Sequence, residues 1–131
     1  MENAIRKPDL LHPKLSYNIV GVLINVFKEL GPDLLEKHYQ RAIALEFVKA
    51  GIIFKEQVPV PLYYKGEKIG TYFADFLIEG LIILEIKKNK NFSLKHIEQL
   101  HGYLKAFDLQ LGILANFTDN GVIYKRIVNI K

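Results

Sequence analysis

The chain has 131 residues, enough for about one folded domain, and we expect a single domain over residues 1–131. Half of the residues are hydrophobic, and cysteine is absent, which excludes disulfides and thiolate metal sites. The net charge of +4 permits a nucleic-acid partner but does not require one. No apolar run is long enough to cross a membrane, and the N-terminus lacks the pattern of a signal peptide, so we expect a cytoplasmic protein without a membrane partner.

The N-terminal part of the sequence predicts a loose arm followed by two helices. The arm covers residues 1–13, and apolar residues then recur at helical spacing over 15–30. Gly31 and Pro32 end this first helix, and Asp33 is placed to cap a second one that runs to about Lys49.

The second predicted helix carries two stripes. One is apolar and consists of Leu35, Ala42, Leu45 and Val48. The other combines acidic and apolar residues at steps of three or four, namely Glu36, Tyr39, Ile43 and Glu46. Acids on a helix face ordinarily contact only solvent, so this stripe becomes functional only if it lies against a site.

Strands dominate the middle of the chain. Residues 52–64 favour a strand that Pro59 and Pro61 break into two, which indicates a sheet edge or a bend. A turn containing Gly66 leads into a strand over 69–78, and a tight turn at Glu79 and Gly80 leads into a strand over 81–87.

The C-terminal part predicts a helix and then a hairpin. Ser93 is placed to cap a helix over 94–107, on which His96, Gln99 and Tyr103 form a polar stripe. Strands over 111–117 and 122–130 flank a strong turn signal at 119–121. The helix is long enough to make the strands on either side of it parallel neighbours, so we expect an α/β (α+β) fold with a mixed sheet flanked by helices.

Three charged residues stand in strands that are otherwise apolar: Asp75, Glu85 and Lys87. Because side chains alternate across a strand, Glu85 and Lys87 share one face, while Leu84 and Ile86 point toward the core. A surface ion pair is the ordinary interpretation of a Glu-x-Lys pattern. Burying charge is unfavourable unless it is paired or binds a metal, so the apolar surroundings favour a divalent-metal site instead. Asp75 and Glu85 would be its ligands, and Lys87 its cationic helper.

Several segments, in order along the chain, resemble the GxxExxY proteins. They are G-P-D-L-L-E-K-H-Y, E-Q-V-P-V-P-L-Y-Y-K-G, A-D-F-L-I-E, L-E-I-K, Q-L-H-G-Y-L and L-G-I-L-A-N-F, and together they span nearly all of residues 15–128. That family is usually placed in the PD-(D/E)XK nuclease superfamily. The resemblance therefore implies a restriction-endonuclease-like core with a mixed sheet of four or more strands, to which the first helix is an addition.

The resemblance also implies a set of site residues. Asp75, Glu85 and Lys87 match the superfamily motif, either Glu46 or Glu36 resembles the helix acid that completes the metal shell, and Gln99 and Tyr103 resemble a polar pair facing the site. Two positions depart from the pattern, because Ala74 replaces the proline of the superfamily name and Phe73 replaces a frequent basic residue.

The function implied is that of a metal-dependent nuclease, endo- or exonucleolytic, acting on DNA or RNA. Asp75, Glu85 and the carbonyl of Ile86 would hold Mg²⁺ or Mn²⁺, since these ions prefer hard oxygen ligands. Lys87 would orient the attacking water or stabilise the developing negative charge. Lys88, Lys90 and Lys95 would either contact the phosphate backbone or serve only solubility.

Two other functions compete with this one. The first is a catalytically silent module that keeps the nuclease fold and binds nucleic acid or protein. The intact set of Asp75, Glu85 and Lys87 argues against it, because buried charge without a role is costly. The second is an interaction protein, such as a homodimer, which the apolar helix over 15–30 favours because such a helix needs partners on more than one side.

Overall fold

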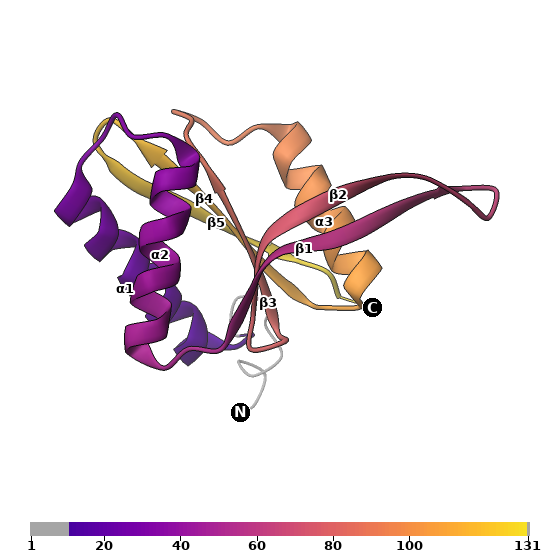
Figure 1. Cartoon of the computed structure of the whole chain (residues 1–131), viewed down its shortest axis with the longest axis horizontal. Helices are drawn as coiled ribbons and strands as arrows, with labels where there is room; N and C mark the ends of the chain where they lie inside the picture. The colour runs from indigo at the N-terminus through magenta and orange to yellow at the C-terminus, as the bar shows by residue number, and fades with distance from the viewer. Residues whose placement is uncertain (1–10, 131) are drawn as a thin grey trace, which may run out of the picture.

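The computed structural model describes residues 11–130, so the predicted arm over 1–13 lies largely outside the described residues. The elements are α1 (Pro13–Leu30), α2 (Glu36–Ala50), β1 (Phe54–Tyr64), β2 (Glu67–Ile78), β3 (Ile82–Lys87), α3 (Leu94–Phe107), β4 (Leu111–Thr118) and β5 (Gly121–Val128). The strands form one sheet in the order β1-β2-β3-β4-β5. Neighbours are antiparallel except β3 and β4, which are parallel as the intervening helix predicted (Figure 1).

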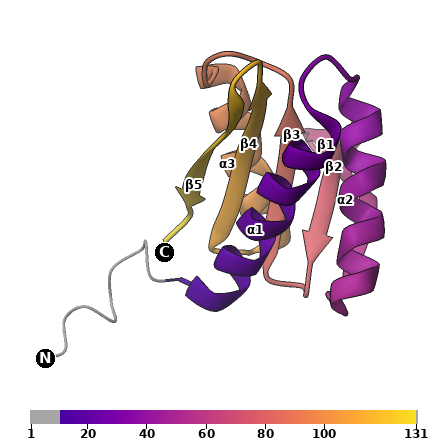
Figure 2. The same ribbon diagram turned by 90° about the vertical axis from the view of Figure 1, so that its left-hand side faces the viewer.

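Helices cover both faces of this sheet. Helices α1 and α2 lie on one face and α3 lies on the other (Figures 1 and 2). Strands β3 and β4 contribute buried side chains to both faces, which explains why their sequences are almost continuously apolar. Each fully buried leucine or isoleucine contributes about 1.5–3 kcal/mol to the stability of this core.

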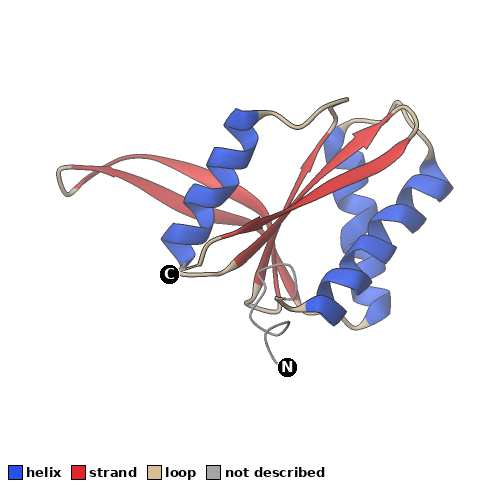
Figure 3. Ribbon diagram, turned by 180° about the vertical axis from the view of Figure 1, so that it is seen from behind, coloured by secondary structure: helices blue, strands red, loops and turns tan. Residues whose placement is uncertain are grey.

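Strand β1 forms one edge of the sheet. Its ladder with β2 continues past Pro59 and Pro61, so the predicted break into two strands is wrong. An edge strand tolerates proline because only one of its sides needs N–H donors. The irregularities lie elsewhere, at Gln57 with a φ of 49° and between Leu62 and Tyr63, where the register shifts. Figure 3 shows the far half of β1 and β2 projecting from the body as a two-stranded ribbon.

Helix α2 packs through a different face from the one its apolar residues suggested. Tyr39, Ile43 and Phe47 are buried, whereas Leu45 and Val48 of the predicted apolar stripe are exposed. Aromatic contacts explain the choice, because the ring of Tyr39 lies 4.3 Å from that of Phe117 and the ring of Phe47 lies 5.6 Å from that of Phe76. The stripe that carries Glu36 therefore runs along the core side of the helix.

The loop before α2 is closed by a tyrosine rather than by the predicted aspartate cap. The helix begins at Glu36 after Leu35, and Asp33 adopts a φ of 79°. The Tyr39 hydroxyl donates a 2.6 Å hydrogen bond to the Gly31 carbonyl and so ties the helix to the preceding loop. This contact joins the first and last residues of the segment G-P-D-L-L-E-K-H-Y.

Helix α3 has the predicted bounds, with Ser93 at the N-cap, although the Ser93 hydroxyl makes no cap bond. It crosses β4 at Gly112, where an added Cβ would lie 2.9 Å from Cγ of Leu100. This close approach seats Tyr103 in the core, so only part of the predicted polar stripe faces solvent. Within residues 11–130, no helix is both long and apolar enough to cross a membrane.

Candidate active site

The candidate site lies where β2 and β3 separate. Their ladder pairs Ile78 with Ile82, Leu77 with Ile83 and Phe76 with Leu84, and then ends. At the next position the two acids replace the ladder. The Asp75 N–H donates to a Glu85 carboxylate oxygen at 2.6 Å, and the Ile86 N–H donates to an Asp75 carboxylate oxygen at 2.8 Å. Each carboxylate is therefore held by the main chain of the opposite strand.

Strand β4 supports β3 where β2 leaves it. The parallel ladder continues through Glu85, Ile86 and Lys87, which lies opposite Asn116. Asn116 is buried, and its amide nitrogen donates a 2.8 Å hydrogen bond to the Asn91 carbonyl. This bond fixes the loop that follows Lys87. The side-chain amide oxygen of Asn116 has no hydrogen-bond partner among the described residues, and the ladder places Asn116 beside Lys87.

The two acids share an environment that disfavours their charge. Glu85 is only 4% exposed, and burial, followed by the charge of Asp75, raises the pKa of Glu85 to about 8. Burial also raises the pKa of Asp75, against the opposing effects of the Ile86 N–H and the Lys87 charge. Within residues 11–130, no salt bridge joins either carboxylate to a cation. The charge of Lys87 acts on both acids without a direct ion pair, so the two carboxylates carry more negative charge than this one cation balances.

That deficit fits a divalent cation. Two carboxylates beside a main-chain carbonyl are hard oxygen donors of the kind that Mg²⁺ and Mn²⁺ prefer. A bound cation would compensate the pair of negative charges that burial now penalises. The described residues hold no cluster of three or more acids, histidines or cysteines close enough to bind a metal, so water and substrate would have to complete the coordination.

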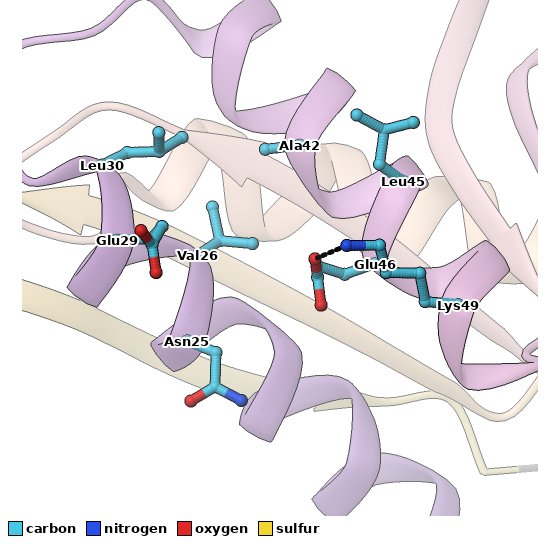
Figure 4. Close-up of a pocket in the computed structure, with 8 residues that line it drawn as sticks. All are labelled: Asn25, Val26, Glu29, Leu30, Ala42, Leu45, Glu46 and Lys49. Atoms are coloured by element: carbon cyan, nitrogen blue, oxygen red, sulfur yellow. Dashed lines mark ion pairs between the residues drawn. The ribbon is translucent and has the colours of Figure 1, made fainter.

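The sequence left open whether Glu36 or Glu46 of α2 belongs to the site, and the structure distinguishes the two. Glu36 accepts a 3.2 Å hydrogen bond from the Lys88 N–H, and its charge contributes to raising the pKa of both Asp75 and Glu85. Glu46 lies elsewhere, in a groove between α1 and α2, where it pairs with Lys49 at 3.7 Å (Figure 4). Ten residues separate the two acids, which is about 15 Å along a helix, so one site cannot contain both.

Helix α3 brings a tyrosine and a histidine toward the acids. Tyr103 is buried, and the pKa of its hydroxyl is raised by burial and by the charges of Glu85 and Asp75. The pKa of His96 is lowered by burial and by the charge of Lys87, which places this imidazole at the rim. Of the polar stripe of α3, Tyr103 therefore lies within electrostatic reach of the acids and His96 within reach of Lys87.

The three lysines expected along a basic rim fall into two places. Lys88 and Lys90 line a hollow with Tyr39 and Phe117 near the start of α2. Lys95 and Gln99 line a separate groove between α3 and the β1–β2 ribbon. A phosphate backbone would meet these lysines on opposite sides of the acids rather than as one patch.

Sequence reasoning missed Gln57, which the structure places at the site. Its left-handed backbone lies on β1 between the ladder pairs that flank Asp75, and its side-chain amide contributes to lowering the pKa of Asp75. Its amide nitrogen also approaches Gln40 of α2 at 3.3 Å. The only available signal was that Gln57 belongs to one of the segments shared with the resembling family, since no spacing rule points to a glutamine in an edge strand.

Comparison with known proteins identifies the family and the fold. A sequence profile described as the PD-(D/E)XK nuclease superfamily matches residues 13–127. No curated protein matches the sequence. Among solved structures, an alkaline exonuclease (LHK-Exo) from Laribacter hongkongensis aligns with a TM-score of 0.52 at 13% identity, covering 92% of this chain and 72% of that protein.

Two further structures align over smaller shares. LHK-Exo in complex with dAMP gives a TM-score of 0.50 at 14% identity, covering 85% of this chain and 69% of that protein. The protein SSO0001 gives a TM-score of 0.49 at 21% identity, covering 67% of this chain and 46% of its own length, so the chain spans less than half of that protein. At such identities the likeness to LHK-Exo speaks for the fold, and it confirms the expected mixed sheet with flanking helices.

Proposed function

Because the chain belongs to the PD-(D/E)XK nuclease superfamily, we propose that it is a metal-dependent nuclease that hydrolyses phosphodiester bonds in nucleic acid. This membership confirms the resemblance found in the sequence at the level of the superfamily, while the assignment to the GxxExxY proteins stays a prediction. The observation that carries the proposal is the pair of carboxylates on separating strands, each fixed by an N–H of the opposite strand.

Asp75, Glu85 and the Ile86 carbonyl are the proposed ligands for Mg²⁺ or Mn²⁺. When bound, such an ion supplies a Lewis acid that polarises the phosphate and lowers the pKa of coordinated water. The hydrogen bonds from Asp75 and Ile86 keep the two carboxylates in place before the ion arrives, which is the preorganisation a metal site needs. Glu36 is the helix acid proposed to complete the outer shell.

Lys87 is the proposed catalytic cation. It follows Glu85 by two residues on the same face of β3, so its ammonium group can orient the attacking water or stabilise the charge that develops on the phosphate. Asn116 lies opposite Lys87 with a free acceptor and would position that ammonium group. Gln57 would position Asp75 from the other strand, and Gln99 and Tyr103 would contact substrate from α3.

The proposed partner is nucleic acid, with DNA or RNA as its substrate. Lys88, Lys90 and Lys95 stand on two sides of the acids, and their charges would hold the backbone on either side of the scissile phosphate. We also propose a cytoplasmic location, a single-domain organisation, and a homodimer that buries the exposed Leu45 and Val48 of α2, which light scattering on the purified chain would detect.

Calorimetry with Mg²⁺ and Mn²⁺, combined with a cleavage assay on labelled DNA and RNA, tests the proposal. We expect metal binding and metal-dependent cleavage by the native chain, and loss of both in Asp75→Asn and Glu85→Gln. Glu46→Gln is the matched control, since it removes an acid of α2 that lies outside the site. The proposal is wrong if the native chain neither binds these ions nor cleaves, or if Glu46→Gln is as defective as Glu85→Gln.

A further inference from the structure

A groove lies between α3 and the β1–β2 ribbon. It has a volume of about 470 Å³ and is lined by Val60, Leu62, Tyr63, Tyr72, Gln99 and Tyr103, among others. This volume falls in the range of roughly 300–1,000 Å³ that is usual for small-molecule sites. The groove is therefore suited to flat rings of nucleoside size.

Aromatic rings form much of its wall. The rings of Tyr72 and Tyr103 lie 6.3 Å apart at an angle of 56°. Packing alone would account for Tyr103, which is buried, but it does not account for Tyr72 and Tyr63, which are 46% and 65% exposed. Exposed rings on a strand surface are platforms on which nucleobases stack, and such stacking tolerates any base because every base has a π-face.

The groove and the candidate active site have Tyr103 as a common neighbour. Tyr103 packs in the same cluster as Ala74 and Ile83, which precede Asp75 and Glu85 by one and two residues. The raised pKa of the Tyr103 hydroxyl has the charges of both acids among its causes, which supports the same placement. A nucleic-acid strand whose phosphate lies at the acids would then extend toward the exposed ring of Tyr72.

Polar side chains border the same groove on α3. Lys95 offers a positive charge to a phosphate, and Gln99 offers both a donor and an acceptor to a base edge. Because Glu98 also lines the groove, the groove lacks the dense positive charge expected of a duplex-binding channel. Stacking, rather than phosphate attraction, is then the main source of affinity in this part of the surface.

We propose that this groove binds the unpaired bases of a single-stranded segment of the substrate, with Tyr72 and Tyr63 as stacking platforms on the β1–β2 ribbon. The inference rests on the proposed nuclease function and narrows its substrate class to nucleic acid that is single-stranded next to the cleaved bond. In a duplex the bases are already stacked on one another, so their faces would be hidden from these rings.

Fluorescence anisotropy of the full chain tests this inference. Labelled oligodeoxythymidine and oligouridine are compared with a hairpin duplex, in EDTA, so that binding is measured without cleavage. We expect the single strands to bind more tightly than the hairpin. We also expect Tyr72→Ala and Tyr63→Ala to weaken single-strand binding about tenfold each, as the loss of one stacked base predicts, while Tyr72→Phe stays within about twofold because it keeps the ring.

Tyr124→Ala is the matched control, because Tyr124 is also a strand tyrosine that is 46% exposed and it lies on β5, away from the groove. The inference is overturned if Tyr72→Ala and Tyr63→Ala bind single strands as Tyr124→Ala does, if the hairpin binds as tightly as the single strands, or if neither binds. Tyr63→Ala keeps the test valid should Tyr72→Ala unfold.

The outcomes separate this inference from the proposed nuclease activity. If cleavage depends on metal but single-strand binding does not depend on Tyr72 and Tyr63, the inference about the groove is overturned and the nuclease proposal stands. If single strands bind in a tyrosine-dependent way but the chain neither binds Mg²⁺ or Mn²⁺ nor cleaves, the groove inference is upheld and the nuclease proposal is overturned.

Discussion

The two ends of the β2–β3 pair are built for different purposes. At the closed end, Ile78 and Ile82 are fully buried and paired through the main chain next to a three-residue turn. At the open end the ladder stops, and carboxylates take over the hydrogen bonds that backbone groups would have made. The six residues of β3 thus include one segment that stabilises the fold and another whose buried charge lowers the stability but forms the site. The acids therefore occupy positions where the main-chain pairing between β2 and β3 has ended.

The largest effect should come from neutralising the open end. Glu85→Gln keeps the shape of the side chain but removes the charge, so we expect metal-dependent cleavage to fall at least about a hundredfold, as for loss of a major electrostatic contributor. Single-turnover cleavage with Mg²⁺ is the measurement. The free energy of unfolding without metal should not decrease, because the neutral amide is easier to bury. A variant that cleaves normally would show that Glu85 is not a ligand.

The closed end should give the opposite result. Ile82→Ala removes a fully buried side chain, so we expect the free energy of unfolding to fall by about 2–5 kcal/mol. Denaturant unfolding measures this loss, and Ile82→Val should lose about 0.5–1.5 kcal/mol. Calorimetry below the unfolding transition should still detect Mg²⁺ binding in both variants. Loss of metal binding in the folded Ile82→Ala protein would contradict a separation of roles.

The pH dependence of stability sharpens the comparison. Burial and the neighbouring charge raise the pKa of Glu85 from its ordinary 4.5 to about 8, so the folded metal-free chain binds this proton more tightly than the unfolded chain does. The stabilisation is fully present below pH 4.5 and is lost as pH rises to about 8, on the order of a few kcal/mol. Urea unfolding across this range, in EDTA, measures it. Glu85→Gln should flatten the slope, and an unchanged slope in that variant would assign it to other groups.

The smallest effect should come from the residue that supports the open end from β1. Gln57→Ala removes a side-chain amide that helps to lower the pKa of Asp75 without touching a ligand, so we expect cleavage to fall about tenfold, as for outer-shell partners of metal ligands. The free energy of unfolding should change by less than about 0.5 kcal/mol, because Gln57 is exposed. Gln110→Ala is the control for removing a glutamine elsewhere, and equal activities of the two variants would exclude a positioning role for Gln57.

Much of the element order was predictable, because apolar periodicity and turn residues act locally. Helix α3 and the parallel pairing of β3 with β4 follow from such signals, and so does the shared face of Glu85 and Lys87. The buried face of α2 was not predictable. Both stripes contain apolar residues, and the contact of Tyr39 with Phe117, which is remote in sequence, decides between them.

The remaining site residues depend on tertiary geometry in the same way. Choosing Glu36 over Glu46 requires knowing which turn of α2 lies beside the end of β3. Finding Gln57 requires knowing that β1 changes its backbone conformation opposite Asp75. The acids themselves were visible because charge inside an apolar strand is unusual wherever it occurs.

The two prolines of β1 have a consequence for the behaviour of the protein in solution. The outer side of an edge strand is a template on which another chain can add a strand, the first step of edge-to-edge aggregation. Because the ladder with β2 runs past Pro59 and Pro61, their nitrogens lie toward the open side, where each removes a donor that an incoming strand would need. The projecting ribbon can therefore remain long and rich in exposed aromatic side chains without joining neighbouring molecules into fibrils.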